Sequence, residues 1–481
     1  IIDCMLPLSG AFRINTESQT GSGTHFFKFL QLCCGIKDNM VTDTIQFFYI
    51  FCTVSRGKNM ILFPHLFMSK PCLKQTAGSG TCQIFSDHGI QRKAGKRFLR
   101  QKDLTPGILL DFFQNLQILP HLLTKSLKKK YDGKTAVILV ATSGDTGKAA
   151  LEGFKDVDHT KIVVFYPVDG VSPMQKHQMN TQEGSNVRVC AIKGNFDDAQ
   201  TGVKKIFTTP SVAEKLAENN MLFSSANSIN WGRLLPQIVY YISAYCDLVN
   251  DGKIELGDKI NVVVPTGNFG NILASYYASL MGLPINKFIC ASNSNNVLTD
   301  FIKTGVYDKN RNFYTTISPS MDILVSSNLE RLLYKLSGDN DEVTRGWMNA
   351  LKSEGKYEVS DNVKAVINDR FYGGFCDDKN TEATIHELFE QDKYLCDTHT
   401  AVAINVYKQY VEETGDKTPS VIASTASPYK FSKAVLEAVE PNTALPETEF
   451  DMVEELHKIS GVEVPAPLAS LKNKVVRFSD V

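Results

Sequence analysis

The pattern of apolar and polar residues is sharpest in residues 261–282, NVVVPTGNFGNILASYYASLMG, where it predicts a strand, a turn and a helix in direct succession. The β-branched run at 262–264 is typical of a strand buried on both faces, and it ends at Pro265 because proline cannot donate to a strand ladder. Apolar residues then recur at helical spacing until Gly282 supplies a stop signal. These helical positions are Ile272, Leu273, Tyr276, Tyr277 and Leu280.

The loop between this strand and this helix has the properties of an anion-binding site. Unpaired backbone N–H groups at a helix start point the same way, and the helix dipole places positive potential behind them. Gly267 and Gly270 allow the backbone to approach an anion closely, and the side chains of Asn268 and Asn271 can add hydrogen bonds. A tight strand-to-helix turn without a ligand is the alternative, and on this stretch alone both interpretations stand.

From residue 119 onward, strand-like and helix-like segments alternate, which predicts an α/β fold with parallel sheets and helices on both faces. Predicted strands cover 135–140, 161–165, 187–191, 287–291 and 420–423, and predicted helices cover 174–181 and 199–207. Ligands of such sheets bind at the carboxyl ends of the strands. The loop at 267–271 follows a strand, as does a second loop at 143–147, so both are expected at ligand-binding edges.

The second loop, SGDTG at 143–147, is rich in hydroxyl and N–H groups that suit a carboxylate or a phosphate. Asp145 and Thr146 could equally be ordinary helix N-caps, so a purely structural role is the alternative.

Composition narrows the class of protein. The chain has 481 residues, of which 43% are hydrophobic and 21% charged, as is typical of a globular protein. Its formal net charge of −1 favours a small molecule as its ligand over a nucleic acid or a membrane surface. Apolar runs such as 45–54 are far shorter than the ~20 residues of a membrane span. The 11 Cys lack metal-like spacing, so free thiols and no metal site are expected, and no secretion signal is evident, which predicts a cytoplasmic location.

Residues 1–117 differ from the rest. They hold 13 Lys and Arg against 7 Asp and Glu, and their apolar residues form clusters that keep neither strand nor helix spacing. The segment is interpreted either as a variable N-terminal domain or as a stretch that is not the protein's natural start, such as a shifted reading frame; the second is favoured, and poor packing is expected. The predicted domains are thus 1–117, 118–250 and 251–481, with the break between the two later lobes at the polar stretch 249–258.

Several motifs in order resemble those of threonine synthase, a pyridoxal-phosphate enzyme of fold type II. They are ATSGDTG at 141–147, GVSPMQKHQMNTQEG at 170–184, GNFDDAQ at 194–200, NSINWGRLLPQ at 227–237, PTGNFGN at 265–271, PSMDILVSSNLERLL at 319–333, DTHTAVA at 397–403 and STASPYKF at 424–431. The resemblance covers about residues 118–481, and several motifs are specific to the family rather than to the fold. It implies two parallel-sheet lobes with the cofactor between them, and a lyase that converts O-phospho-L-homoserine and water to L-threonine and phosphate.

The resemblance also implies roles for individual residues. The cofactor phosphate would be held by Gly267, Asn268, Phe269, Gly270 and Asn271. Thr425 would lie near the pyridine nitrogen of the cofactor. The substrate would be bound by Ser143, Gly144, Asp145, Thr146, Asn227 and Arg233. Arg233 suits a phosphate, with a structural ion pair as its alternative. Ser320, Asp322 and Asn328 are similar to further active-site positions.

The chain departs from the family at the lysine that carries the cofactor as a Schiff base, in a motif like HGPTxAFKD. Alignment without gaps places Phe112 in the lysine position, and alignment on the acidic residue places Leu110 there. Lys102 precedes an aspartate as the family lysine does, but Pro106 soon follows, where the family has helix. The catalytic lysine is therefore unassigned. Two alternatives to a working synthase remain: a lysine-less binding protein of the same fold, and a related phospho-lyase or dehydratase.

Overall fold

The computed structural model describes residues 82–85, 112–131, 133–227, 230–442 and 444–479. Of the described residues, 278–283 fall in one compact unit and all the others fall in a second. Both large sheets belong to the second unit. Lys102, Leu110 and almost all of segment 1–117 lie outside the described residues, so the expectations about that segment remain predictions, as does the division at 117 and 250.

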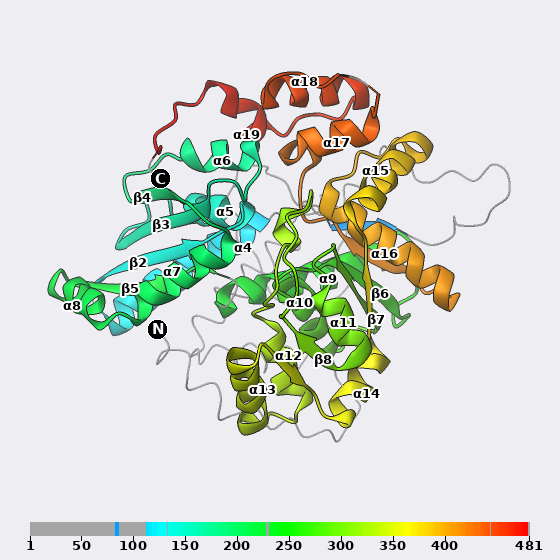
Figure 1. Cartoon of the computed structure of the whole chain (residues 1–481), viewed down its shortest axis with the longest axis horizontal. Coiled ribbons are helices and arrows are strands. Elements are labelled where there is room, and N and C mark those ends of the chain that lie inside the picture. The colour runs from blue at the N-terminus through cyan, green and yellow to red at the C-terminus, as the bar shows by residue number, and fades with distance from the viewer. Residues whose placement is uncertain (1–81, 86–111, 132, 228–229, 443, 480–481) are drawn as a thin grey trace, which may run out of the picture. The chain divides into compact units, whose positions relative to one another are not determined.

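The first sheet has four parallel strands in the order β4-β3-β2-β5 (Figure 1). Its strands are β2 (Thr135–Ala141), β3 (Thr160–Pro167), β4 (Val187–Ile192) and β5 (Met221–Ser225). The helices nearby in the chain are α4 (Phe112–Lys130), α5 (Asp145–Phe154), α6 (Pro173–Asn180), α7 (Phe196–Thr208) and α8 (Pro210–Glu218).

Side chains of β2 alternate between two cores, as the geometry of a strand requires. Ile138 and Val140 pack in the core that includes Leu151 of α5, whereas Leu139 packs with Val203 of α7 on the other face. The sheet is thus covered by α5 on one face and α7 on the other. This burial on both faces explains why the sequence of β2, TAVILVA, is almost continuously apolar.

The second sheet has the order β1-β11-β6-β7-β10, in which β11, β6, β7 and β10 run parallel and β1 pairs antiparallel to β11. Its strands are β1 (Cys82–Phe85), β6 (Ile260–Pro265), β7 (Ile285–Ser292), β10 (Phe371–Phe375) and β11 (Ser420–Ala423), and a separate small ribbon contains β8 (Val306–Asp308) and β9 (Lys356–Glu358). The helices of this part are α9 (Trp231–Asn250), α10 (Gly270–Leu280), α11 (Val297–Thr304), α12 (Leu329–Leu336), α13 (Asp341–Ser353), α14 (Asp361–Arg370), α15 (Asp378–Asp392) and α16 (Thr398–Thr414).

The C-terminal part connects the two sheets. It contains α17 (Ser432–Val439), α18 (Glu449–Ser460), α19 (Ala466–Ala469) and the 3₁₀ turns Pro428–Lys430 and Ser470–Asn473; a further 3₁₀ turn, Pro319–Met321, lies earlier in the chain. Helices α17 and α18 pack in the core of the second sheet, whereas Phe478 lies in the core of the first. The backbone N–H of Arg477 donates to the carbonyl of Asn180 at the end of α6 (2.8 Å), which fixes the tail on the first sheet's helices.

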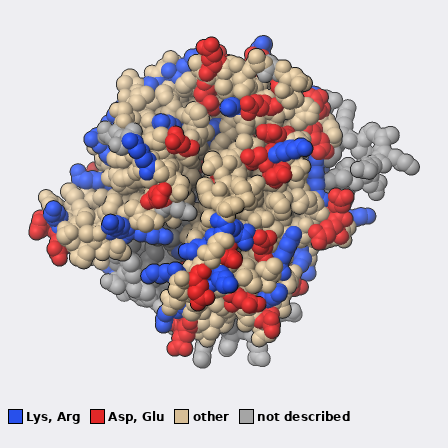
Figure 2. Space-filling view, viewed as in Figure 1, with Lys and Arg blue, Asp and Glu red and all other residues tan. Residues whose placement is uncertain are grey.

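Every predicted strand and helix from residue 119 onward that falls on described residues is confirmed, with ends that differ by a few residues. Strands β1, β5, β8, β9 and β10 were not predicted. None of the helices among the described residues is both long and apolar enough to cross a membrane. On the face drawn in Figure 2, basic and acidic side chains are interspersed over the described surface.

Candidate functional site

The loop between β6 and α10 adopts an unusual backbone conformation. Phe269 has a positive φ of 61°, a region that a bulky residue rarely occupies, and its carbonyl accepts the N–H of Leu273 (3.0 Å) in the first turn of α10. The Phe269 ring is fully buried and lies 6.1 Å from the ring of Phe371, centroid to centroid. Burial of this ring thus holds the backbone in a left-handed turn at the helix start, an arrangement that directs successive N–H groups to one side.

Close approach explains the first glycine of this loop. A Cβ on Gly267 would lie 2.6 Å from the carbonyl oxygen of Ser320, which is backbone and cannot move aside easily. The segment around Ser320 therefore packs directly on the loop and forms part of the same cavity wall.

The SGDTG loop after β2 is closed by Thr142, whose hydroxyl accepts the N–H groups of Gly144 (3.0 Å) and Gly147 (2.8 Å). Gly144 has a φ of 135°, and a Cβ there would overlap the carboxamide of Gln175 at 2.4 Å. That carboxamide donates to Oδ1 of Asp145 (3.1 Å). The loop is thus a rigid turn that presents its hydroxyl and N–H groups at the carboxyl end of β2.

Asp145 is the residue of this loop that carries a charge, and it has a buried cationic partner. Nζ of Lys430 lies 3.1 Å from its Oδ1, with side chains that are only 4% (Lys430) and 16% (Asp145) exposed. This pair neutralises the carboxylate at the cavity edge, so the loop does not repel an anionic ligand as strongly as a lone aspartate would.

Arg233, in the first turn of α9, supplies a second buried cation. Its side chain is 4% exposed, one Nη donates to the carbonyl of Ala226 (3.2 Å) and the other to the hydroxyl of Thr146 (3.3 Å). Burial lowers the pKa of Arg233 to about 10, which leaves the guanidinium protonated at neutral pH. Asn227 fixes the end of β2 nearby, since its side chain donates to the carbonyl of Ala141 (2.8 Å) and accepts the N–H of the same residue (3.3 Å).

The wall of the cavity also includes His399, at the start of α16. Its Nε2 accepts the backbone N–H of Ser320 (3.2 Å), and its Nδ1 lies 3.4 Å from Oδ1 of Asp397, the N-cap of α16. Behind Ser320, the carboxylate of Asp322 accepts from Asn293 (2.7 Å) and other polar groups, and burial raises the pKa of Asp322 to about 6. These contacts fix the segment that covers the glycine loop.

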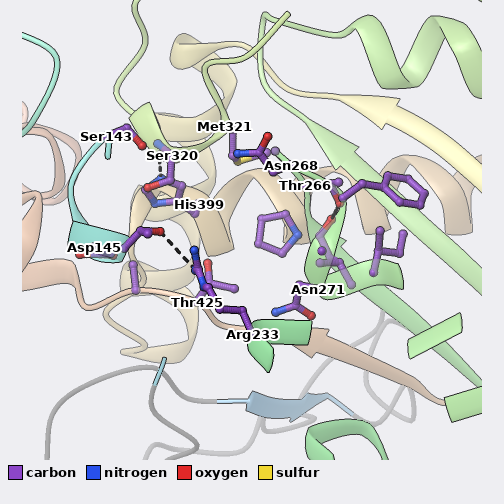
Figure 3. Close-up of a pocket in the computed structure, with 18 of the residues that line it drawn as sticks. Ser143, Asp145, Arg233, Thr266, Asn268, Asn271, Ser320, Met321, His399 and Thr425 are labelled. Atoms are coloured by element: carbon purple, nitrogen blue, oxygen red, sulfur yellow. Dashed lines mark hydrogen bonds between the residues drawn. The ribbon is translucent and has the colours of Figure 1, made fainter. Parts of the chain in front are cut away.

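These segments converge on one cavity of about 160 Å³ (Figure 3). Among the predicted site residues, all but Gly144 line it: Ser143, Asp145, Thr146, Asn227, Arg233, Gly267, Asn268, Phe269, Gly270, Asn271 and Thr425. Ser320 also lines it, whereas Asp322 and Asn328 lie behind the wall. The structure thus brings the two loops and Arg233 together, and the roles assigned to these residues remain predictions.

Sequence reasoning missed other residues of the wall. They include Phe196, Gln237, Thr266, Met321 and His399. His399 falls within the motif DTHTAVA, so its type and place were visible, but its contact with Ser320 spans 79 residues and leaves no local signal.

The chain is similar in sequence to threonine synthases and to threonine synthase-like proteins. A family model described as "Threonine synthase, C-terminal" matches residues 400–479. The human protein named "Threonine synthase-like 1" is 42% identical over 334 residues, which are 68% of this chain and 44% of that protein. Threonine synthase of Saccharomyces cerevisiae is 36% identical over 343 residues, covering 68% of this chain and 65% of that protein. The chain thus spans less than half the length of the human relative.

Two solved structures are similar over most of their length. A pyridoxal-phosphate-bound threonine synthase from Brucella melitensis shares 36% identity with a TM-score of 0.64, covering 78% of this chain and 75% of that one. The yeast enzyme shares 31% identity with a TM-score of 0.66, covering 78% and 74%. These similarities confirm the predicted α/β fold of type II pyridoxal-phosphate enzymes.

Proposed function

Because the chain belongs to the threonine synthase family, we propose that its cavity binds pyridoxal 5'-phosphate as a cofactor and supports the conversion of O-phospho-L-homoserine and water to L-threonine and phosphate. The observation that carries this proposal is the convergence of two strand-end loops and a buried arginine on one small cavity. The proposed reaction removes phosphate from the γ carbon of the substrate and adds water at the β carbon.

The residues of the 267–271 loop fit the cofactor phosphate. The left-handed turn at Phe269 and the start of α10 supply N–H donors, and Gly267 lets the loop pack directly against the backbone of Ser320. Thr425 contributes a hydroxyl to the same cavity, suited to the pyridine nitrogen. When bound, the cofactor supplies a ring that stabilises negative charge developing on substrate carbon atoms.

The other side of the cavity fits the substrate. The SGDTG loop offers backbone N–H groups and the hydroxyls of Ser143 and Thr146 to the substrate carboxylate. Arg233 is directed into the same space by its bond to Thr146 and provides a planar cation for the substrate phosphate. In this arrangement Arg233 and the SGDTG loop orient the substrate between its two anionic groups.

A second candidate function is binding of cofactor and substrate without turnover. It is favoured by one observation: among the described residues that line the cavity, none is a lysine. The family's lysine motif is also absent from the sequence, and Phe112, one of the two residues aligned with it, begins α4. A protein of this kind would keep the phosphate and carboxylate loops but would lack the amine that carries the cofactor and moves protons.

One experiment separates the two functions. The purified chain is incubated with pyridoxal phosphate and O-phospho-L-homoserine, and threonine and inorganic phosphate are quantified. A parallel sample is reduced with borohydride and mapped by peptide mass spectrometry. Equimolar threonine and phosphate with one modified lysine support the synthase. Bound cofactor without modification or turnover supports the binding protein, and failure to bind the cofactor contradicts both.

A further inference from the structure

A phosphate-binding loop requires that its carbonyl groups point away from the phosphate. In a trans peptide unit, the C=O of one residue and the N–H of the next lie on opposite sides. When the carbonyl of Gly267 is fixed in the protein wall, the N–H of Asn268 must therefore face the other way. In the same manner, the carbonyl of Asn268 sets the direction of the N–H of Phe269.

Both of these carbonyls are bonded by one short segment, residues 326–328, which precedes α12. The hydroxyl of Ser326 donates to the carbonyl of Gly267 at 3.0 Å. Asn328 donates twice to the carbonyl of Asn268, from its backbone N–H at 3.2 Å and from its side-chain Nδ2 at 2.9 Å. The segment thus occupies consecutive carbonyls of the loop from a position 59 or 60 residues further along the chain.

The two donors are themselves held in place and shielded from water. Asn328 is fully buried and Ser326 is 7% exposed. Oδ1 of Asn328 accepts from Nη1 of Arg331, so its Nδ2 is the atom that faces Asn268. The backbone N–H of Ser326 donates to the hydroxyl of Tyr307 (2.8 Å), whose ring stacks on Tyr357 with centroids 5.3 Å apart. The segment is therefore anchored by packing outside the cavity.

We propose that Ser326 and Asn328 are positioning residues that pre-organise the 267–271 loop for a phosphate. Neither lines the cavity; each acts by fixing a carbonyl so that the following N–H faces the ligand. This inference rests on the proposed function, because it takes the loop to be the site of the cofactor phosphate. A loop fixed in advance needs no reorganisation when the phosphate binds, which increases affinity for the phosphate group alone.

The test compares two ligands that share a ring and differ in the phosphate, pyridoxine 5'-phosphate and pyridoxine. Neither has an aldehyde, so binding does not depend on a lysine. Dissociation constants are measured by calorimetry for the full chain and for Asn328→Asp, which places an oxygen against the carbonyl of Asn268, and Ser326→Ala. Ser275→Ala is the matched control, because Ser275 is fully buried and its hydroxyl donates to the carbonyl of Ile272 within α10 (2.6 Å).

The wild-type chain is expected to prefer pyridoxine phosphate. Asn328→Asp should reduce the ratio of the two affinities by about tenfold or more, Ser326→Ala by about three- to tenfold, and Ser275→Ala not at all. A wild-type chain without preference for the phosphate overturns the proposed function of the loop. If Asn328→Asp and Ser326→Ala both keep the wild-type preference for pyridoxine phosphate, the positioning roles are wrong but the proposed function of the loop stands. The same conclusion follows if each variant loses affinity for the two ligands equally. Ser326→Ala keeps the test decisive should Asn328→Asp fail to fold.

Discussion

Replacing Lys430 by methionine tests how the charge at the SGDTG loop is balanced. Methionine keeps the length and apolar stem of the side chain but removes the ammonium that lies 3.1 Å from Oδ1 of Asp145. The carboxylate would then retain the side-chain amide of Gln175 as a donor at 3.1 Å, without a cation in this contact. Lys430→Met therefore leaves a largely buried negative charge at the edge of the cavity.

The expected loss in the free energy of unfolding follows from the burial of the Asp145–Lys430 pair. Removing one partner of a buried ion pair typically lowers the free energy of unfolding by about 3–5 kcal/mol. Because the Asp145 side chain is 16% exposed, water can solvate the carboxylate in part, which places the expected loss near the lower end, at about 3 kcal/mol. Asp145→Asn combined with Lys430→Met removes both charges, so most of this loss should be recovered in the double variant.

Urea unfolding followed by fluorescence measures the effect. For a large chain with a denaturant slope above about 3 kcal/mol per molar, the single variant should lower the midpoint by about 0.5–1 M. The double variant should return it close to the wild-type value. A single variant with an unchanged midpoint, or a double variant as unstable as the single one, would refute the reasoning that an unpaired carboxylate is the source of the loss.

Three further changes have defined outcomes. Gly267→Ala should weaken binding of pyridoxine phosphate by at least about tenfold without weakening pyridoxine, because the new Cβ would meet the carbonyl of Ser320 at 2.6 Å; calorimetry showing equal affinity would contradict this. Since burial raises the pKa of Asp322 to about 6, its folded form binds a proton more readily than its unfolded form, and stability should rise as pH falls from 7 to 5. Asp322→Asn should remove about 1 kcal/mol of that rise in urea unfolding, and an unchanged pH dependence would count against it. Arg233→Lys should weaken binding of O-phospho-L-homoserine by about tenfold while pyridoxine phosphate binds normally, because lysine cannot grip a phosphate with two parallel bonds; equal loss of both ligands would show a structural role instead.

The parts of the fold that could be predicted are those in which consecutive apolar residues indicate a buried segment. Strand β6 is buried at all six positions, as its continuous apolar run predicts. The two glycines of strand β10, FYGGF, predict a turn from the sequence alone, but in the structure close packing leaves little room for a side chain at either position. A Cβ on Gly374 would lie 2.6 Å from Val406 of α16, and one on Gly373 would lie 3.1 Å from the backbone of Thr299. Such contacts arise from distant segments and are invisible in the local pattern.

The same distinction applies to the site. Both glycine loops could be predicted because a strand, glycines and a helix start follow one another in the sequence. The contacts around the first loop could not be predicted, because they join distant segments: Asn328 reaches Asn268 across 60 positions, and His399 reaches Ser320, on the segment that covers this loop, across 79. The resemblance pointed to Asn328 as an active-site position but not to this contact. The predicted cytoplasmic location and the predictions for residues 1–117 are untested by the described structure.

The most direct test of the central claim is a crystal structure of this chain with pyridoxal phosphate. The account predicts that the cofactor phosphate lies at the start of α10, with its oxygens about 3 Å from backbone nitrogens of the 267–271 loop and with the ring nitrogen beside Thr425. A phosphate bound elsewhere, or one that faces carbonyl groups of this loop, would contradict the claim that the loop is the cofactor's anion site.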